Sequence, residues 1–172
     1  MKLIKIKNKK DSDIMSEEKE ILIIYGSETG NAEALADDAG ILAKKMNLKS
    51  RIMDMDDISV DDLSDSEFLL ICCSTWGEGE QPMNAEDLYQ ASCDCDDNSM
   101  HGVNFAVLAL GDTDYEFFCE SGKEWDKVLE EKGGRRINDR IDCDVDYEDT
   151  TECEDWIEET LQKFSEMILG EA

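Results

Sequence analysis

Ser27, Thr29 and Asn31 occupy every second position of a short polar stretch. This stretch follows the apolar run at residues 21–24 after Tyr25 and Gly26. Small and apolar residues then recur at the spacing of one helical face. The expected order is therefore strand, polar loop and helix, with free backbone N–H groups of the helix's first turn at the loop. This order predicts a phosphate site, although a simple connection with a hydroxyl capping the helix would explain the same stretch.

Two later polar loops also follow buried apolar runs. Residues 68–73 lead into a loop that contains Trp76, and residues 103–110 lead into a loop that contains Tyr115. Both rings lie among glycines and short polar residues, which predicts that they line the rim of a site, unless they only close the edge of a sheet. A flat ligand between the two rings would gain about 0.5–1.5 kcal/mol for each ring that it stacks on.

The elements that must position these loops alternate along the chain. Strands are expected at residues 21–26, 49–54, 68–73, 103–110 and 137–145, and helices at 32–46, 82–89, 121–132 and from a Thr151–Glu154 capping box onwards, with an acidic loop at 54–65. Such alternation predicts an α/β fold, a doubly wound parallel sheet with helices on both faces. Ligands of such sheets bind beyond the carboxyl ends of the strands, where all three polar loops lie, so we expect one ligand site there.

The composition narrows the class of partner. The chain has 172 residues, 41% of them hydrophobic, which fits one domain, expected at residues 19–172 after a basic, mobile tail at 1–18 with five lysines in its first ten residues. The net charge of −27 argues against binding to nucleic acid or to an anionic membrane. Acidic surfaces suit a basic protein partner or a salty medium, and the composition does not distinguish these.

Seven cysteines form an odd set without a C-x-x-C pair. Neither a disulfide framework nor a zinc site is therefore indicated, and reduced thiols in a cytoplasmic protein are expected.

Common nucleotide-binding and signalling motifs are absent. The first loop lacks the G-x-x-x-x-G-K-[ST] pattern and its lysine, and G-x-G-x-x-G is missing too. A phosphorylatable receiver domain would need acids where the chain has Tyr25 and Gly26. What remains is a set of neutral donors suited to one terminal phosphate.

Three segments together resemble a known family. They are YGSETGNAE at residues 25–33, STWGEGEQPMNAEDLY at 74–89 and LALGDTDYEFFCESGKEWDKVLEEKGGRRI at 108–137. In this order and spacing they resemble the flavodoxin-like FMN domain of diflavin reductases, most nearly that of the sulfite reductase flavoprotein. The resemblance implies a five-stranded sheet in the order 2-1-3-4-5 that holds non-covalent FMN.

The resemblance also assigns roles by position. It implies that the phosphate is held by Ser27, Glu28, Thr29, Gly30, Asn31 and Ala32, one side of the isoalloxazine by Ser74, Thr75, Trp76 and Gly77, and the other by Leu110, Gly111, Asp112, Thr113, Asp114, Tyr115, Glu116, Phe117, Phe118 and Cys119. Tyr115 matches the stacking tyrosine of the family, whereas Trp76 replaces the usual Tyr or Gln. The peptide at Gly77 is expected near flavin N5.

These observations favour an FMN-dependent electron carrier with no catalytic or metal-binding side chain of its own. Electrons would come singly from a separate FAD-containing NAD(P)H reductase and pass to a basic-faced heme or iron–sulfur protein. The FAD and NADPH domain of diflavin reductases has no counterpart in these residues, so a complete NADPH oxidoreductase is not expected. The alternatives are a detached FMN subunit of a multi-component reductase such as sulfite reductase, and a non-redox binding or regulatory module.

Overall fold

The computed structural model describes residues 19–144 and 150–170, and its centre is a parallel sheet. The strands are β1 (Glu20–Gly26), β2 (Lys49–Asp54), β3 (Phe68–Ser74), β4 (Asn104–Gly111), β5 (Arg135–Arg136) and β6 (Ile141–Asp144). Their order is β2-β1-β3-β4-β5, and β6 also pairs with β4. The predicted doubly wound sheet in the order 2-1-3-4-5 is thereby confirmed.

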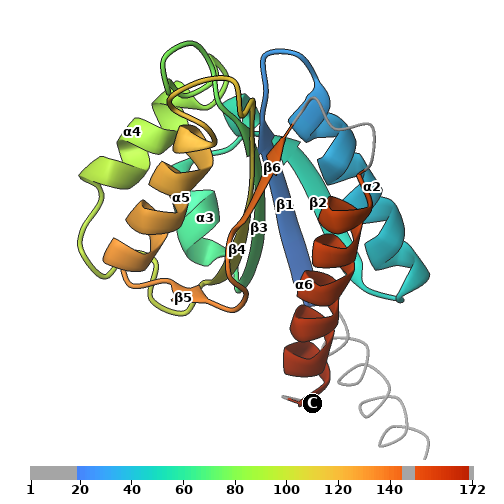
Figure 1. The fold of residues 1–172 in the computed structure, drawn as a ribbon. Helices are drawn as coiled ribbons and strands as arrows, with labels where there is room; N and C mark the ends of the chain where they lie inside the picture. Colours follow the sequence, from blue (N-terminus) through green and yellow to red (C-terminus); the bar gives the residue numbers. More distant parts are fainter. Residues whose placement is uncertain (1–18, 145–149, 171–172) are drawn as a thin grey trace, which may run out of the picture.

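Helices cover both faces of this sheet. They are α2 (Asn31–Lys45), α3 (Val60–Asp65), α4 (Glu86–Asp94), α5 (Glu120–Glu131) and α6 (Thr151–Gly170), with a short 3-10 turn, η1 (Met55–Asp57). Figure 1 shows α2 and α6 on one face and α3, α4 and α5 on the other. β1 begins and α6 ends at the edge of the sheet opposite to the loops that follow β1, β3 and β4 (Figure 1).

Two hydrophobic cores lie between the sheet and its helix layers. All seven residues of β3 are buried, and successive side chains point to opposite faces. Phe68 and Leu70 therefore pack into the core under α2 and α6, whereas Leu69 and Ile71 pack into the core under α3, α4 and α5. Burial on both faces explains why the central strands are continuous apolar runs rather than alternating ones.

The predicted inward faces of the two long C-terminal helices are confirmed. In α5 the buried apolar side chains are Trp125, Val128 and Leu129. In α6 the predicted stripe of Ile157, Leu161, Phe164 and Ile168 is buried.

The structure differs from the sequence prediction in several elements. The expected last strand is split into β5 and β6, both of which pair with β4, and residue 145 lies outside the described residues. The acidic segment at 54–65 is not only a loop, because a capping box between Ser59 and Asp62 begins α3. The helix expected from Pro82 begins only at Glu86, after a turn, and α6 begins at Thr151 itself rather than after it as a cap.

The cysteines are the clearest correction. Cys143 at the end of β6 forms a disulfide with Cys153 in the first turns of α6. The remaining cysteines, Cys72, Cys73, Cys93, Cys95 and Cys119, are free thiols. The sequence did not reveal the disulfide because its partners are ten residues apart and meet only when α6 folds back onto the sheet.

Within the described residues, no helix combines the length and apolarity that a membrane crossing requires. The basic tail predicted at residues 1–18 lies outside the described part of the chain.

Two adjacent buried thiols in β3 are expected to lower the stability of the protein at alkaline pH. Burial raises the pKa of Cys72 from its ordinary 9.0 to about 12 and raises the pKa of Cys73 as well. Between pH 9 and pH 12 the folded state keeps these protons, whereas the unfolded chain loses them. The contribution of the two thiols to the free energy of unfolding is therefore fully present below pH 9 and is lost as the pH rises towards 12. We expect about 1 kcal/mol lost per buried thiol by pH 10, measured by urea unfolding under reducing conditions.

The control is Cys72→Ala, whose free energy of unfolding should fall less steeply between pH 8 and pH 10 than that of the unaltered protein. Equal slopes for the two proteins would show that the buried thiol does not contribute.

Candidate functional site

The loops that follow β1, β3 and β4 meet at the carboxyl edge of the sheet and enclose a cavity of about 450 Å³. Its lining residues are Glu28, Thr29, Asn31, Ser74, Thr75, Trp76, Gly77, Leu110, Gly111, Asp112, Tyr115 and Phe117. A second hollow of about 230 Å³, which runs between α2, β6 and the start of α6, shares Asn31 and Leu110 with this cavity. The three polar loops that the sequence singled out thus form one site.

The first loop presents the amino end of α2. Gly30 caps this helix in the left-handed conformation, with φ 89°, and no side chain caps the helix. The Ser27 Oγ atom accepts a hydrogen bond from the Gly30 N–H at 2.9 Å. Among the hydrogen bonds of the described residues, none occupies the backbone N–H groups of Asn31 and Ala32. These amides lie at the positive end of the helix dipole, which suits a phosphate.

The second loop is a tight hairpin. Trp76 and Glu80 exchange two backbone hydrogen bonds, of 2.9 and 2.7 Å, and the turn between them uses positive φ angles at Gly77 and Gly79. The Trp76 side chain is 49% exposed. The hairpin also packs on the third loop, because a Cβ atom on Gly79 would lie 2.9 Å from the Cβ of Phe117.

The third loop closes on itself at its base. A Cβ atom on Gly111 would lie only 2.5 Å from the backbone nitrogen of Cys119, which itself has a positive φ of 58°. Asp112 accepts a hydrogen bond from the Asp114 N–H on its side chain, at 2.9 Å, and one from the Tyr115 N–H on its carbonyl. This turn leaves Tyr115 64% exposed, on the rim that the sequence predicted for it.

Not every predicted site residue lines the cavity. The side chain of Ala32 is buried in the core under α2, so only its backbone amide, in the first turn of the helix, is available to the site. Three exposed residues of the third loop, Thr113, Asp114 and Glu116, stand outside the lining. Phe118 and Cys119 form the base of the loop, and burial raises the pKa of the Cys119 thiol to about 12. The Thr113 hydroxyl donates to the Asp144 carboxylate on β6.

The cavity fits a flavin mononucleotide in three respects. The Ser74 hydroxyl is a buried polar group that lines the cavity and has no hydrogen-bond partner within the described residues. Such an orphaned group is rare in folded proteins unless a ligand or water satisfies it. Trp76 and Tyr115 bring ring surface to the same cavity as the free amides of α2, and the lining contains no Lys or Arg. A bound phosphate would therefore rest on neutral donors.

Sequence reasoning missed the residue that anchors the second loop. Gln81 is buried; it accepts a hydrogen bond from the Trp125 indole at 3.1 Å and donates to the Ser121 carbonyl and the Glu124 carboxylate. The Ser121 hydroxyl also donates to the Glu80 carbonyl, at 2.7 Å. A glutamine within a polar loop gives no periodic signal, so its burial could not be read from the residues around it.

Known proteins match this chain in both sequence and fold. The flavodoxin family model matches residues 23–156. The Sulfite reductase [NADPH] flavoprotein alpha-component of Bacillus subtilis is 41% identical over 154 residues, which are 90% of this chain and 25% of that protein. The protein of the same name from Escherichia coli K12 is 42% identical over 132 residues, which are 74% of this chain and 21% of that protein. The chain thus spans about a quarter of the length of these relatives.

Solved structures of flavodoxins superpose on this chain. Oxidised flavodoxin 2 from Bacillus cereus superposes with a TM-score of 0.74 at 28% identity, over 86% of this chain and 99% of that one. A point mutant of flavodoxin from Pseudomonas aeruginosa superposes with a TM-score of 0.75 at 29% identity, over 85% and 99%. The matched sequence spans all three loops of the cavity, and the chain belongs to the flavodoxin family of FMN-binding electron-transfer proteins.

Proposed function

We propose that this chain carries single electrons from an FAD-containing NAD(P)H reductase to a heme or iron–sulfur protein. The observation that supports this role is the cavity itself, which joins the amino end of α2, where no side chain caps the helix, to two exposed aromatic rings at the carboxyl edge of the sheet. FMN supplies the redox chemistry when it is bound, and the protein supplies binding, orientation and electrostatics.

Each part of the cavity has a separate task in this proposal. The amides of Asn31 and Ala32, with the hydroxyl of Thr29, bind the phosphate. The buried Ser74 hydroxyl hydrogen-bonds to the cofactor, which satisfies the group that the protein leaves unpartnered. Trp76 and Tyr115 flank the ring system and exclude water from its faces.

Carboxylates on the second and third loops of this cavity would select the partner. The second loop carries Glu78 and Glu80, and the third carries Asp112, Asp114 and Glu116. Four of these five are exposed, and Asp112 is half-buried. Negative charge around an exposed ring edge attracts a basic-faced protein and raises its association rate, most strongly at low ionic strength.

A second candidate is a detached FMN subunit that works in a stable multi-component reductase. It is favoured by the 41% identity with the Bacillus subtilis protein over 90% of this chain, because that relative is named as a sulfite reductase flavoprotein. The two candidates share the cofactor and differ in whether the reductase partner dissociates between turnovers.

Reconstituted electron transfer tests the proposal. Apoprotein mixed with FMN should develop a flavin spectrum that stays with the protein through gel filtration. With NADPH and an FAD-containing reductase, the holoprotein should then reduce a basic heme protein such as cytochrome c at a rate that falls as salt rises from about 0.05 to 0.5 M, because screening weakens the attraction.

Three outcomes separate the alternatives. Apoprotein that takes up no FMN would indicate a non-redox module and would refute the carrier. Co-elution with an FAD-containing protein from the native source at nanomolar concentration would favour the subunit. A rate that does not depend on salt would exclude a steering role for the acidic loops.

A further inference from the structure

The turn before α4 reaches across to the phosphate loop through one side chain. The Asn84 Oδ1 atom accepts a hydrogen bond from the backbone N–H of Ser27 at 3.0 Å. The Nδ2 atom of the same side chain donates to the Asp54 carboxylate at 3.1 Å. Asp54 is the last residue of β2, so Asn84 joins the carboxyl ends of β1 and β2 to the segment between β3 and α4.

The two partners of Asn84 require a carboxamide. A backbone N–H can only donate, and an ionised carboxylate can only accept, so the oxygen must face Ser27 and the nitrogen must face Asp54. An aspartate at this position could still accept from Ser27, but it would place a second carboxylate against Asp54 and lose the donor. An alanine would leave the half-buried Ser27 N–H without this acceptor.

From Ser27 the hydrogen bonds continue to the anion-binding amides. The Ser27 hydroxyl accepts from the Gly30 N–H at 2.9 Å, and Gly30 takes the left-handed conformation that begins α2. Asn31, which follows Gly30 and begins α2, lines the cavity. A shift of the backbone at Ser27 would therefore be passed through Gly30 to the first amides of α2.

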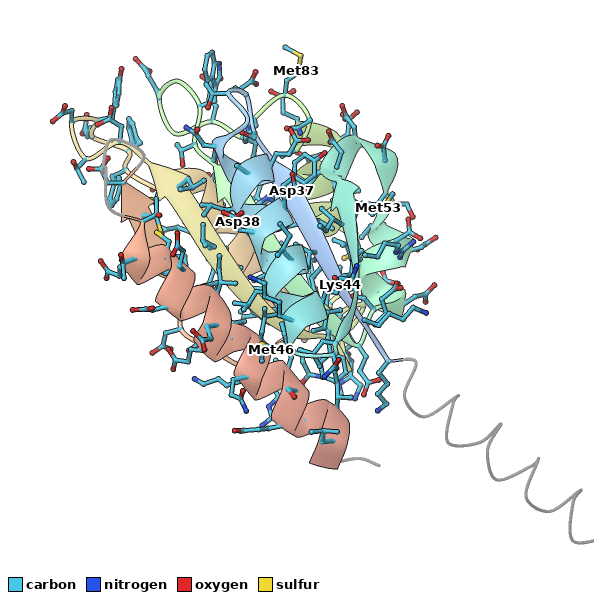
Figure 2. All side chains as sticks on the ribbon, turned by 90° about the vertical axis from the view of Figure 1, so that its right-hand side faces the viewer. Asp37, Asp38, Lys44, Met46, Met53 and Met83 are labelled. Carbon is cyan, nitrogen blue, oxygen red and sulfur yellow. A yellow bond between two sulfur atoms is a disulfide. The ribbon has the colours of Figure 1, made fainter. Side chains whose placement is uncertain are left out.

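A second contact links the same two segments. The backbone N–H of Met83 donates to the Glu28 Oε1 atom at 2.6 Å, which draws the carboxylate of the first loop towards the turn before α4. The Met83 side chain takes no part, because it is 75% exposed and projects away from the molecule (Figure 2). The turn thus restrains both Ser27 and Glu28. It also gives the Glu28 carboxylate a hydrogen-bond donor, the Met83 N–H.

We propose that Asn84 is a positioning residue that presets the phosphate loop of the flavin site without touching the cofactor. The proposal rests on FMN being the ligand of this cavity. Because Asn84 acts through Ser27 and Gly30, it should affect binding of the phosphate and not of the isoalloxazine. Riboflavin, which lacks the phosphate, separates the two contributions.

The experiment compares dissociation constants for FMN and riboflavin, measured by quenching of flavin fluorescence on the apoprotein. Asn84→Ala should weaken FMN binding about 10-fold, because the phosphate loop loses one hydrogen bond that holds it in the binding conformation. Riboflavin binding should change less than about 2-fold. Asn84→Asp should weaken FMN binding further, since it keeps the acceptor but adds a repelling charge. The matched control is Asn104→Ala, which removes a side-chain hydrogen bond to the Glu67 carbonyl at the opposite edge of the sheet and should leave both constants unchanged.

A cofactor-free readout keeps this proposal separate from the proposed function. In the apoprotein, Asn84→Ala should speed hydrogen exchange at the Ser27 and Gly30 amides relative to the strands, because the loop loses its restraint. If Asn84→Ala does not fold, Asp54→Ala removes the Nδ2 partner, together with the cap that the Asp54 carboxylate forms to the Asp56 N–H at 2.9 Å, and should give a smaller loss in the same direction. Equal weakening of FMN and riboflavin, or an unchanged FMN constant with unchanged exchange, would overturn the positioning role, whereas unaltered protein that binds neither flavin would instead refute FMN as the ligand.

Discussion

Replacing Thr29 with Asp should raise the dissociation constant for FMN about 100-fold and change that for riboflavin only a few-fold. Thr29 is exposed and lines the cavity beside the amino end of α2, where the lining offers no Lys or Arg. A carboxylate about 4 Å from the phosphate costs roughly 1 kcal/mol in bulk water and about 4 kcal/mol at an effective dielectric constant of 20. The upper value corresponds to about a 1,000-fold loss of affinity.

Two control variants isolate the charge effect in this prediction. Thr29→Val keeps the shape and removes only the hydroxyl, so FMN binding should weaken about 10-fold, as expected for one lost hydrogen bond to a charged group. Leu169→Asp adds the same charge at an exposed site near the end of α6 and should leave both flavins bound as before. If Thr29→Asp binds FMN normally, the phosphate lies in another part of the cavity.

The second large effect is expected at the contact between α5 and β4. A Cβ atom on Gly122 would lie 2.2 Å from the Cβ of Ala109 and 2.8 Å from its Cα, which is backbone and cannot rotate away. Gly122→Ala should therefore lower the free energy of unfolding by about 2 kcal/mol, even though alanine favours a helix by about 1 kcal/mol. Urea denaturation followed by circular dichroism measures this change.

The same substitution at an open site should not lower the stability. A Cβ atom on Gly170 would meet nothing within 4 Å, so Gly170→Ala should leave stability unchanged or slightly raised. Adding Ala109→Gly to Gly122→Ala removes the closest clash and should restore part of the loss. A Gly122→Ala protein as stable as the original would mean that α5 can move off the sheet. Because the Ser121 hydroxyl donates to the Glu80 carbonyl, such a movement would also loosen the second loop of the cavity.

The strand order and the three loops could be predicted because they depend on local features of the sequence. Continuous apolar runs mark strands that are buried on both faces, and glycines among polar residues mark the loops that end them. The exposed positions of Trp76 and Tyr115 followed from the same kind of reading, since rings among glycines and short polar residues have little core around them.

The supporting contacts could not be predicted because they join residues far apart in the chain. Asn84 meets Ser27 across 57 residues, and Gln81 meets Trp125 across 44. The Cys143–Cys153 pair and the division of the last strand into β5 and β6 likewise depend on how the chain packs at the edge of the sheet. Residue type and periodicity contain no information about such partners.

β1 begins and α6 ends at the edge of the sheet opposite to the loops that follow β1, β3 and β4 (Figure 1). A protein tethered beyond either position would therefore be attached without covering the mouth of the cavity. A flexible tether would also raise the effective concentration of that protein near the acidic loops, so that weak docking could suffice for exchange. The start of β1 and the end of α6 are therefore both positions at which a second protein could be linked without blocking the three loops.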